Sequence, residues 1–241
     1  MLEAGLWGLG AASALVVGAL VGLTGSVPRR FVALAMAFGA GGLISALAFD
    51  LTEDAFAHGG TLPVAAGLAA GALVFFTGDQ LLHARGAARR GPRMKQVGTN
   101  GPAIVLGALL DGIPESVVLG STLLAGAGIG VPFLAAVFVS NVPEALSAAS
   151  DLRREGHRPE WIIRLWVGVA LVSGLAAALG YWLLGEMGAG AVPLIQSFAA
   201  GAILTMLADT MIPEAFSEGG DLTGLATVFG FALAFLLSTV S

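Results

Sequence analysis

The chain has 241 residues, of which 56% are hydrophobic and only 11% are charged, and its formal net charge is −5. A soluble domain carries about 25% charged residues, so the composition excludes an ordinary soluble domain and indicates an integral membrane protein whose partner is the lipid bilayer. No nucleic-acid partner is expected. The absence of cysteine excludes a disulfide framework and metal ligation by thiolates.

Eight apolar segments are long enough to cross a membrane, which takes about 20 residues of helix. In chain order they are 4–24, 31–51, 61–83, 101–125, 131–150, 161–184, 191–212 and 222–240. The connections are short, so we predict a single transmembrane domain over 1–241, with spans 1–3 at 4–83, spans 4–5 at 101–150 and spans 6–8 at 161–240. No Lys or Arg precedes Arg29, unlike in a cleaved signal peptide, so the first span is expected to be retained.

The basic residues indicate how the chain is oriented. All eleven Lys and Arg lie in or next to three connections, those between spans 1 and 2, 3 and 4, and 5 and 6. With eight spans these connections share one side, which the positive-inside rule makes cytoplasmic. We therefore predict a multi-pass protein of the cell (cytoplasmic) membrane with both termini outside. The basic segment 84–96 is open to two interpretations, a lipid- or partner-binding patch or a plain topology signal.

Two parts of the chain match each other in sequence. Residues 38–60 and 198–220 align without gaps and share nine identities. Five crossings separate the two copies, so they run in opposite directions, which predicts an inverted repeat of spans 1–3 against spans 6–8. The expected fold is all-α, with eight transmembrane helices in a 3+2+3 inverted-repeat bundle. Such repeats recur in secondary transporters, and the alternative is an ancestral duplication without transport.

Two matched polar strings interrupt the neighbouring spans 4 and 5. They are Asp111-Gly112-Ile113-Pro114-Glu115 and Ser140-Asn141-Val142-Pro143-Glu144. A charged side chain at the bilayer centre costs about 2.5–3.5 kcal/mol even on lenient insertion scales. A proline inside a helix also leaves a backbone carbonyl without its hydrogen bond. The repetition of both penalties predicts a polar site between the two helices.

The possible metal donors near the middle of spans 4 and 5 are all oxygen atoms. They come from Asp111, Glu115, Ser140, Asn141 and Glu144 and from the carbonyls that the prolines free. A net-negative oxygen set suits a divalent cation. The alternatives are helices that the prolines merely kink, or carboxylates that pair with a buried base, but spans 4 and 5 contain no Lys, Arg or His.

Further acids lie toward the ends of spans 2 and 7. Asp50, Glu53 and Asp54 are expected at the outer end, and Asp209 and Glu214 at the inner end. Two acidic vestibules would concentrate cations at each mouth of a central site. The alternative interpretation is that these acids are solvated helix ends.

At these residues the chain resembles the ZIP (Zrt/Irt-like protein) family of divalent-metal transporters. That family carries His-Asn-x-Pro-Glu-Gly on span 4 and His/Gln-Asn/Asp-x-Pro-Glu on span 5. The Pro-Glu pairs and Asn141 match this pattern, as does the Pro213-Glu214 pair of span 7. The resemblance implies a metal site between spans 4 and 5 and import into the cytoplasm by an elevator-like or rocking movement. Asp111, Gly112 and Ser140 replace the family's histidine, asparagine and histidine or glutamine, so no imidazole remains at the core.

We therefore predict a transporter that moves a divalent cation such as Zn, Mn, Fe or Cd inward, with the metal as substrate and no prosthetic group. The alternative is a ZIP-fold protein that has lost metal transport and moves another solute or acts as a binding or regulatory subunit. An enzyme is not expected, because the chain lacks His-Glu-x-x-His and comparable motifs. The small residues Gly67 and Gly71 are compatible with a homodimer or with packing inside the chain.

Overall fold

The computed structural model describes residues 1–25, 27–84, 101–125, 130–188 and 190–240. Every regular element in these ranges is a helix. The elements are α1 (Leu2–Leu23), α2 (Arg29–Ala46), η1 (Leu47–Thr52), α3 (Glu53–Gly59), α4 (Thr61–Ala84), α5 (Gly101–Thr122), η2 (Leu123–Ala125), α6 (Val131–Arg154), α7 (Pro159–Met187), α8 (Val192–Met206), η3 (Leu207–Met211), α9 (Ile212–Gly219), η4 (Gly220–Leu222) and α10 (Thr223–Val240).

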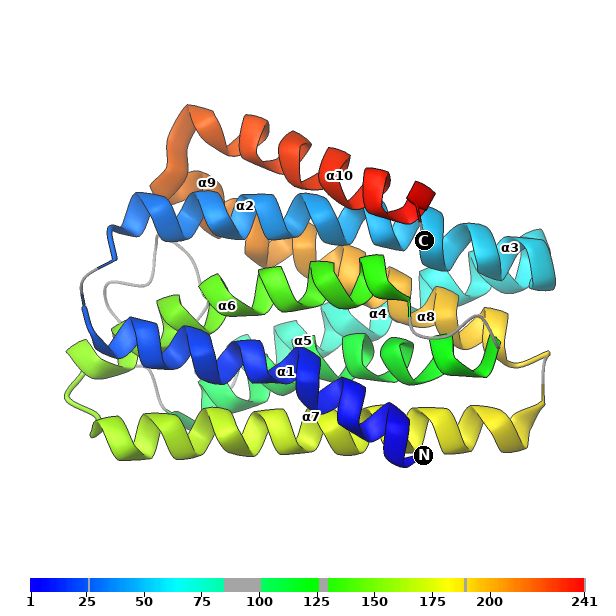
Figure 1. Cartoon of the computed structure of the whole chain (residues 1–241), viewed down its shortest axis with the longest axis horizontal. Helices are drawn as coiled ribbons and strands as arrows, with labels where there is room; N and C mark the ends of the chain where they lie inside the picture. The colour runs from blue at the N-terminus through cyan, green and yellow to red at the C-terminus, as the bar shows by residue number, and fades with distance from the viewer. Residues whose placement is uncertain (26, 85–100, 126–129, 189, 241) are drawn as a thin grey trace.

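Six helical stretches of the described chain are long and apolar enough to cross a membrane. One of them, Val192–Val240, contains a reversal of direction between α9 and α10 (Figure 1). The prediction of an all-α, multi-pass membrane protein is confirmed at this level. The count of eight spans and their division into three, two and three stay predictions.

The second and seventh predicted spans are longer than the sequence indicates. We expected the second to end at residue 51, but the helix passes through the π-helical segment η1 and ends at Gly59. Likewise the seventh passes through the π-helical segment η3 and ends at Gly219. A π-helical turn accommodates an extra residue without ending a helix, so the acidic residues after it remain helical.

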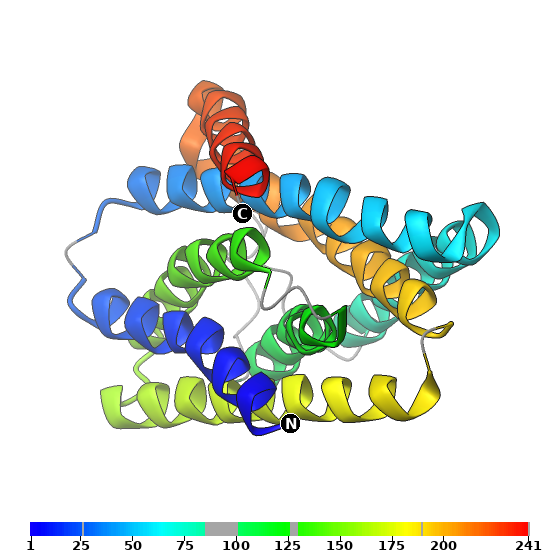
Figure 2. The ribbon, with the colours of Figure 1, turned by 45° about the vertical axis from the view of Figure 1, so that its right-hand side comes forward.

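The helices pack in two groups, which can be followed in Figure 2. In the first group α1 lies against α6 and α7, and α5 lies against α7. In the second group α2 lies against α9 and α10, and α4 lies against α8. The groups meet mainly where α2 crosses α6 and where α5 touches α8.

The crossing of α2 and α6 is a close approach of two backbones. A Cβ atom added to Gly39 of α2 would lie 2.7 Å from the Cα of Ser140. Glycine therefore allows α2 to lie directly against the polar string of α6, as small residues do in membrane helix packing.

The small-residue pair of α4 serves packing within the chain. A Cβ on Gly67 would lie 2.7 Å from the Leu194 carbonyl oxygen of α8, and Gly71 is closest to Phe198 of the same helix. Because α8 packs against these two glycines, they give no support to a homodimer, which stays a prediction.

Candidate cation site between two helices

Both prolines of the polar strings lie inside continuous helices. Pro114 is within α5 and Pro143 is within α6. Neither residue has an N–H group, so the carbonyls four residues earlier, those of Leu110 and Val139, lack the usual helical donor. Each helix thus offers a backbone oxygen close to its carboxylates.

The carboxylate of Glu115 lies within electrostatic range of two others, one on each helix. Glu115 of α5 is buried, with 3% of its surface exposed. Its carboxylate interacts electrostatically with those of Glu144 on α6 and Asp111 one turn earlier on α5. Glu144 and Asp111 are half-buried. A buried carboxylate such as Glu115, with two further carboxylates acting on it, requires a positive charge or a proton to be stable.

The remaining predicted donors lie on α6 next to this cluster. Ser140 and Asn141 are both buried. The Ser140 hydroxyl donates a hydrogen bond to the Val137 carbonyl at 2.9 Å, which leaves its oxygen lone pairs as acceptors. Within the described ranges no three residues among His, Cys, Asp and Glu are grouped closely enough to hold a metal by themselves. A cation here would therefore depend on the amide, hydroxyl and backbone oxygens as well as on the carboxylates.

The described histidine side chains lie at helix ends. His58 is 3.2 Å from Asp54 at the end of α3. The His157 ring stacks on Trp161 at the start of α7, with a centroid distance of 4.6 Å. The side chain of His83 is outside the described part of the chain. Neither described imidazole adds a nitrogen donor to the middle of α5 and α6.

The predicted outer acids belong to η1 and α3. Asp50 is half-buried and bonds Ser238 of α10 through its side chain, while its Oδ2 atom has no hydrogen-bond partner among the described residues. Glu53 is exposed, and Asp54 pairs with His58 on the same helix. The structure thus places these acids near one another along one helix.

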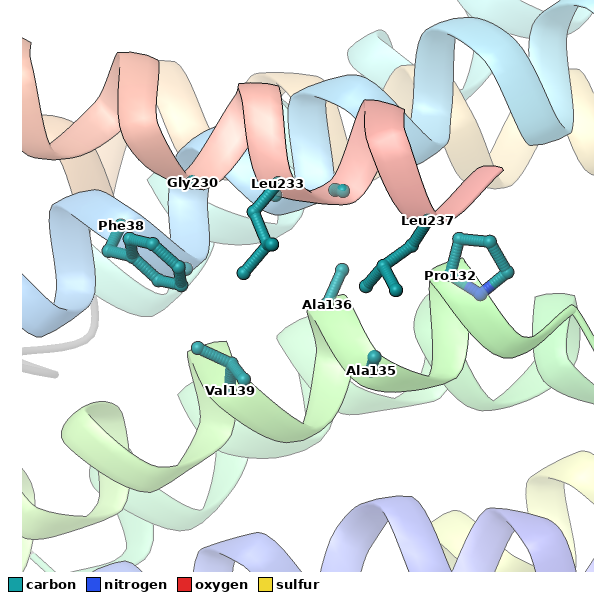
Figure 3. A pocket seen from close by; sticks show the side chains of 11 residues that line it. Phe38, Pro132, Ala135, Ala136, Val139, Gly230, Leu233 and Leu237 are labelled. Atoms are coloured by element: carbon teal, nitrogen blue, oxygen red, sulfur yellow. The ribbon is translucent and has the colours of Figure 1, made fainter. Parts of the chain in front are cut away.

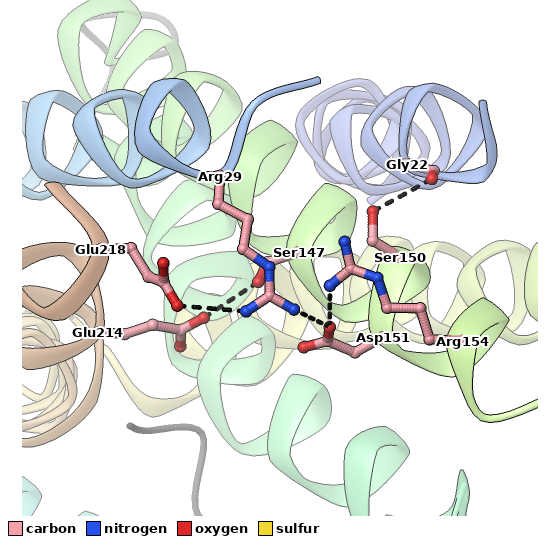
Figure 4. A network of polar contacts seen from close by, with 8 residues as sticks. All are labelled: Gly22, Arg29, Ser147, Ser150, Asp151, Arg154, Glu214 and Glu218. Atoms are coloured by element: carbon pink, nitrogen blue, oxygen red, sulfur yellow. Dashed lines mark hydrogen bonds and ion pairs between the residues drawn. The ribbon is translucent and has the colours of Figure 1, made fainter. Parts of the chain in front are cut away.

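One of the two predicted inner acids, Glu214, lies on the same short helix as Glu218, which pairs with Arg29. Arg29 contacts Asp151 of α6 at 3.4 Å and Glu218 of α9 at 3.2 Å (Figure 4). Glu214 of α9 accepts a hydrogen bond from the Ser147 hydroxyl at 3.1 Å. Asp209 is exposed in η3. These contacts join α2 and α9 of the second packing group to α6 of the first.

Sequence reasoning missed a polar stripe on α6. Ser140, Glu144, Ser147 and Asp151 are spaced by four, three and four residues, so they share one helix face. The stripe leads from the Pro-Glu string to the Arg29 ion pairs. Its spacing was available in the sequence, but the partners of Ser147 and Asp151 depend on the fold.

Comparison with known proteins identifies one distant relative, and no family model matches the chain. A protein of Arabidopsis thaliana named a "putative zinc transporter" is 27% identical over 222 residues. The match covers 85% of this chain and 34% of that protein, so the chain spans about a third of the relative's length. The apolar helices and this likeness together indicate a multi-pass membrane protein. The resemblance to the ZIP family is consistent with the match and stays a resemblance.

Proposed function

We propose that the chain is a transporter that moves a divalent metal cation inward across the cytoplasmic membrane. The ion would bind between α5 and α6 to Asp111, Glu115, Ser140, Asn141 and Glu144. The observation that carries the proposal is the buried Glu115, which interacts with the carboxylates of Asp111 and Glu144 in the middle of two apolar helices. A bound cation would offset the mutual repulsion of these carboxylates.

The polar stripe of α6 supports a route between this site and one end of the bundle. Ser147 and Asp151 continue the face of Ser140 and Glu144 toward Arg29. Glu214 and Asp209 form the inner vestibule of the proposed pathway, and Asp50, Glu53 and Asp54, on η1 and α3, form the outer vestibule. The ion pairs of Arg29 would separate when the inner mouth opens, because they join the two packing groups.

An eight-helix, 3+2+3 inverted repeat fits the same proposal. The π-helical segments begin at Leu47 and Leu207, which are paired positions in the alignment of 38–60 with 198–220. The turns that follow use Gly60 and Gly220, which both have positive φ and are also paired in that alignment. The contact of α2 with α10 also has its counterpart in the contact of α8 with α4. These correspondences support a ZIP-like inverted repeat, and the orientation with both termini outside rests on the distribution of Lys and Arg.

The donor set favours hard cations over zinc. Zinc sites are built largely from nitrogen and sulfur donors, whereas Mn, Mg and Ca accept carboxylate and carbonyl oxygen. The Arabidopsis relative is named for zinc, so a metal-by-metal comparison is needed to decide which ion this chain moves.

A second candidate is a membrane protein with this architecture that has lost metal transport and moves another solute or acts as a binding or regulatory subunit. It is favoured by the absence, in the described chain, of a group of three His, Cys, Asp or Glu residues that could hold a metal. Elemental analysis of the purified protein separates the two candidates, since only the first requires bound metal.

The proposal is tested by uptake into proteoliposomes of wild type, Glu115→Gln and Glu144→Gln. A unit charge pair 4 Å apart in a site with an effective dielectric constant of 20 is worth about 4 kcal/mol, so we expect uptake of Mn, Zn, Fe or Cd to fall at least about tenfold in each variant. Glu160→Gln is the control, because Glu160 is exposed in the first turn of α7. Uptake equal to wild type in both site variants would refute the proposal.

A further inference from the structure

An apolar groove opens between α2, α6 and α10, next to the proposed site (Figure 3). Every residue that lines it is apolar, and the empty space within it is about 300 Å³, including its open side. The walls include Phe38 and Gly42 of α2, Ala136 and Val139 of α6, and Leu233 and Leu237 of α10. Figure 3 shows both leucines pointing from α10 toward α6.

The groove is open on the surface that the bilayer covers. Val139, Leu233 and Leu237 are 37%, 49% and 41% exposed. The helices that carry them, and α2, belong to stretches with the length and hydropathy of membrane spans. The mouth of the groove therefore opens into the hydrocarbon layer.

Water is a poor occupant of this space, because an ordered water needs two to four polar partners. The walls supply apolar atoms only. An empty groove would also forfeit the dispersion contacts of its lining atoms. A hydrocarbon chain satisfies both conditions, and the bilayer supplies such chains at this depth.

We propose that the groove is a lipid site that holds one acyl chain of a membrane phospholipid. The acyl chain would lie against α6 next to the proposed cation site. Val139, which lines the groove, is adjacent to Ser140, and Gly39, another lining residue, lies against Ser140. The bound acyl chain would thus fill the space beside the contact of α2 with α6, where the two packing groups meet. This inference goes beyond transport and does not depend on it.

The test uses the full chain in phospholipid vesicles that contain a phospholipid with a photoreactive diazirine in its acyl chain. After illumination, mass spectrometry of peptides locates the labelled residues. We expect labelling at Val139, Leu233 and Leu237 to exceed labelling at Leu171 and Leu175, which are exposed on α7 at 54% and 63%. Equal labelling at the two places would show ordinary surrounding lipid only and would overturn the proposal.

A groove-filling variant gives the second arm of the test. In Gly42→Leu the new Cβ would lie 3.6 Å from the Ala136 Cβ and 3.8 Å from the Gly230 carbonyl oxygen, both ordinary contacts, and Gly42 lines the groove that the added side chain is meant to fill. We expect groove labelling to fall at least about fivefold, since a filled cavity admits no further carbon atoms.

The matched control is Gly168→Leu on α7, where an added Cβ meets nothing within 4 Å. Groove labelling is expected to be unchanged in this variant. Undiminished labelling in a folded Gly42→Leu protein would contradict the proposal. If Gly42→Leu does not fold, Ala135→Leu at the half-buried edge of the groove is judged by the same criterion.

Discussion

Substitution of Gly39 by alanine tests the close contact between α2 and the site-bearing helix α6. The added Cβ would lie 2.7 Å from the Ser140 Cα and 3.0 Å from its Cβ. The helices must separate by about 0.7 Å at this point to reach the 3.4 Å of ordinary van der Waals contact. Because the contact is with backbone-bearing atoms, no side-chain rotation relieves it.

The size of the effect follows from two opposing contributions. Overpacking of a tight contact costs about 1–3 kcal/mol, whereas alanine is about 1 kcal/mol more favourable than glycine inside a helix. Gly42→Ala on the same helix is the matched control, because its Cβ would be 3.6 Å from its nearest neighbour, Ala136. Gly42→Ala therefore gains the higher helix propensity of alanine without the steric clash expected in Gly39→Ala. Gly39→Ala should therefore be about 1–3 kcal/mol less stable than Gly42→Ala.

The assay is thermal unfolding of the two purified variants in the same detergent. For a chain of this size, 1 kcal/mol corresponds to roughly 2–4 °C, so Gly39→Ala is expected to unfold roughly 2–12 °C below Gly42→Ala. Cation uptake should also fall in Gly39→Ala, because Ser140 moves with α6. An equal or higher unfolding temperature for Gly39→Ala would refute the packing described for α2 and α6.

Two further predictions concern the Arg29 ion pairs and the turn before α10. Arg29→Gln removes contacts to Asp151 and Glu218 that are about half exposed, so at low salt it should lower stability by at most about 1 kcal/mol for each pair. The loss should shrink at high salt because exposed charges are screened, and a salt-independent loss would contradict this explanation. Gly220→Ala places a side chain at φ 65° and should lower stability by about 1–2 kcal/mol, as measured by thermal unfolding. The control is Gly224→Ala, where a Cβ meets nothing within 4 Å. Equal stability of the two variants would contradict the backbone strain expected for a side chain at position 220.

The features that the sequence predicts best are those with local causes. Long apolar segments specify membrane-length helices, so the all-α membrane architecture follows from hydropathy alone. The Pro-Glu strings are conspicuous because proline and glutamate are both unfavourable inside an apolar helix. Glu115 is buried and interacts electrostatically with Glu144, and a cation site at these residues stays a prediction.

The features that the sequence does not reveal depend on distant parts of the chain. From the sequence Arg29 is a topology signal, and in the fold it also pairs with residues 122 and 189 positions later in the sequence. The apolar groove requires three helices from both packing groups, so no local pattern indicates it. Helix lengths were underestimated at η1 and η3, because acidic residues after an apolar segment are typical of a helix end, whereas these segments continue as helix.

X-ray absorption spectroscopy of the purified protein loaded with Mn²⁺ or Zn²⁺ tests the central claim most directly, because it identifies the atoms bound to the metal. We predict a bound ion whose nearest neighbours are all oxygen, and loss of that signal in Glu115→Gln and Glu144→Gln. A nitrogen shell from imidazole, or no metal bound at all, would contradict an oxygen-built cation site between α5 and α6.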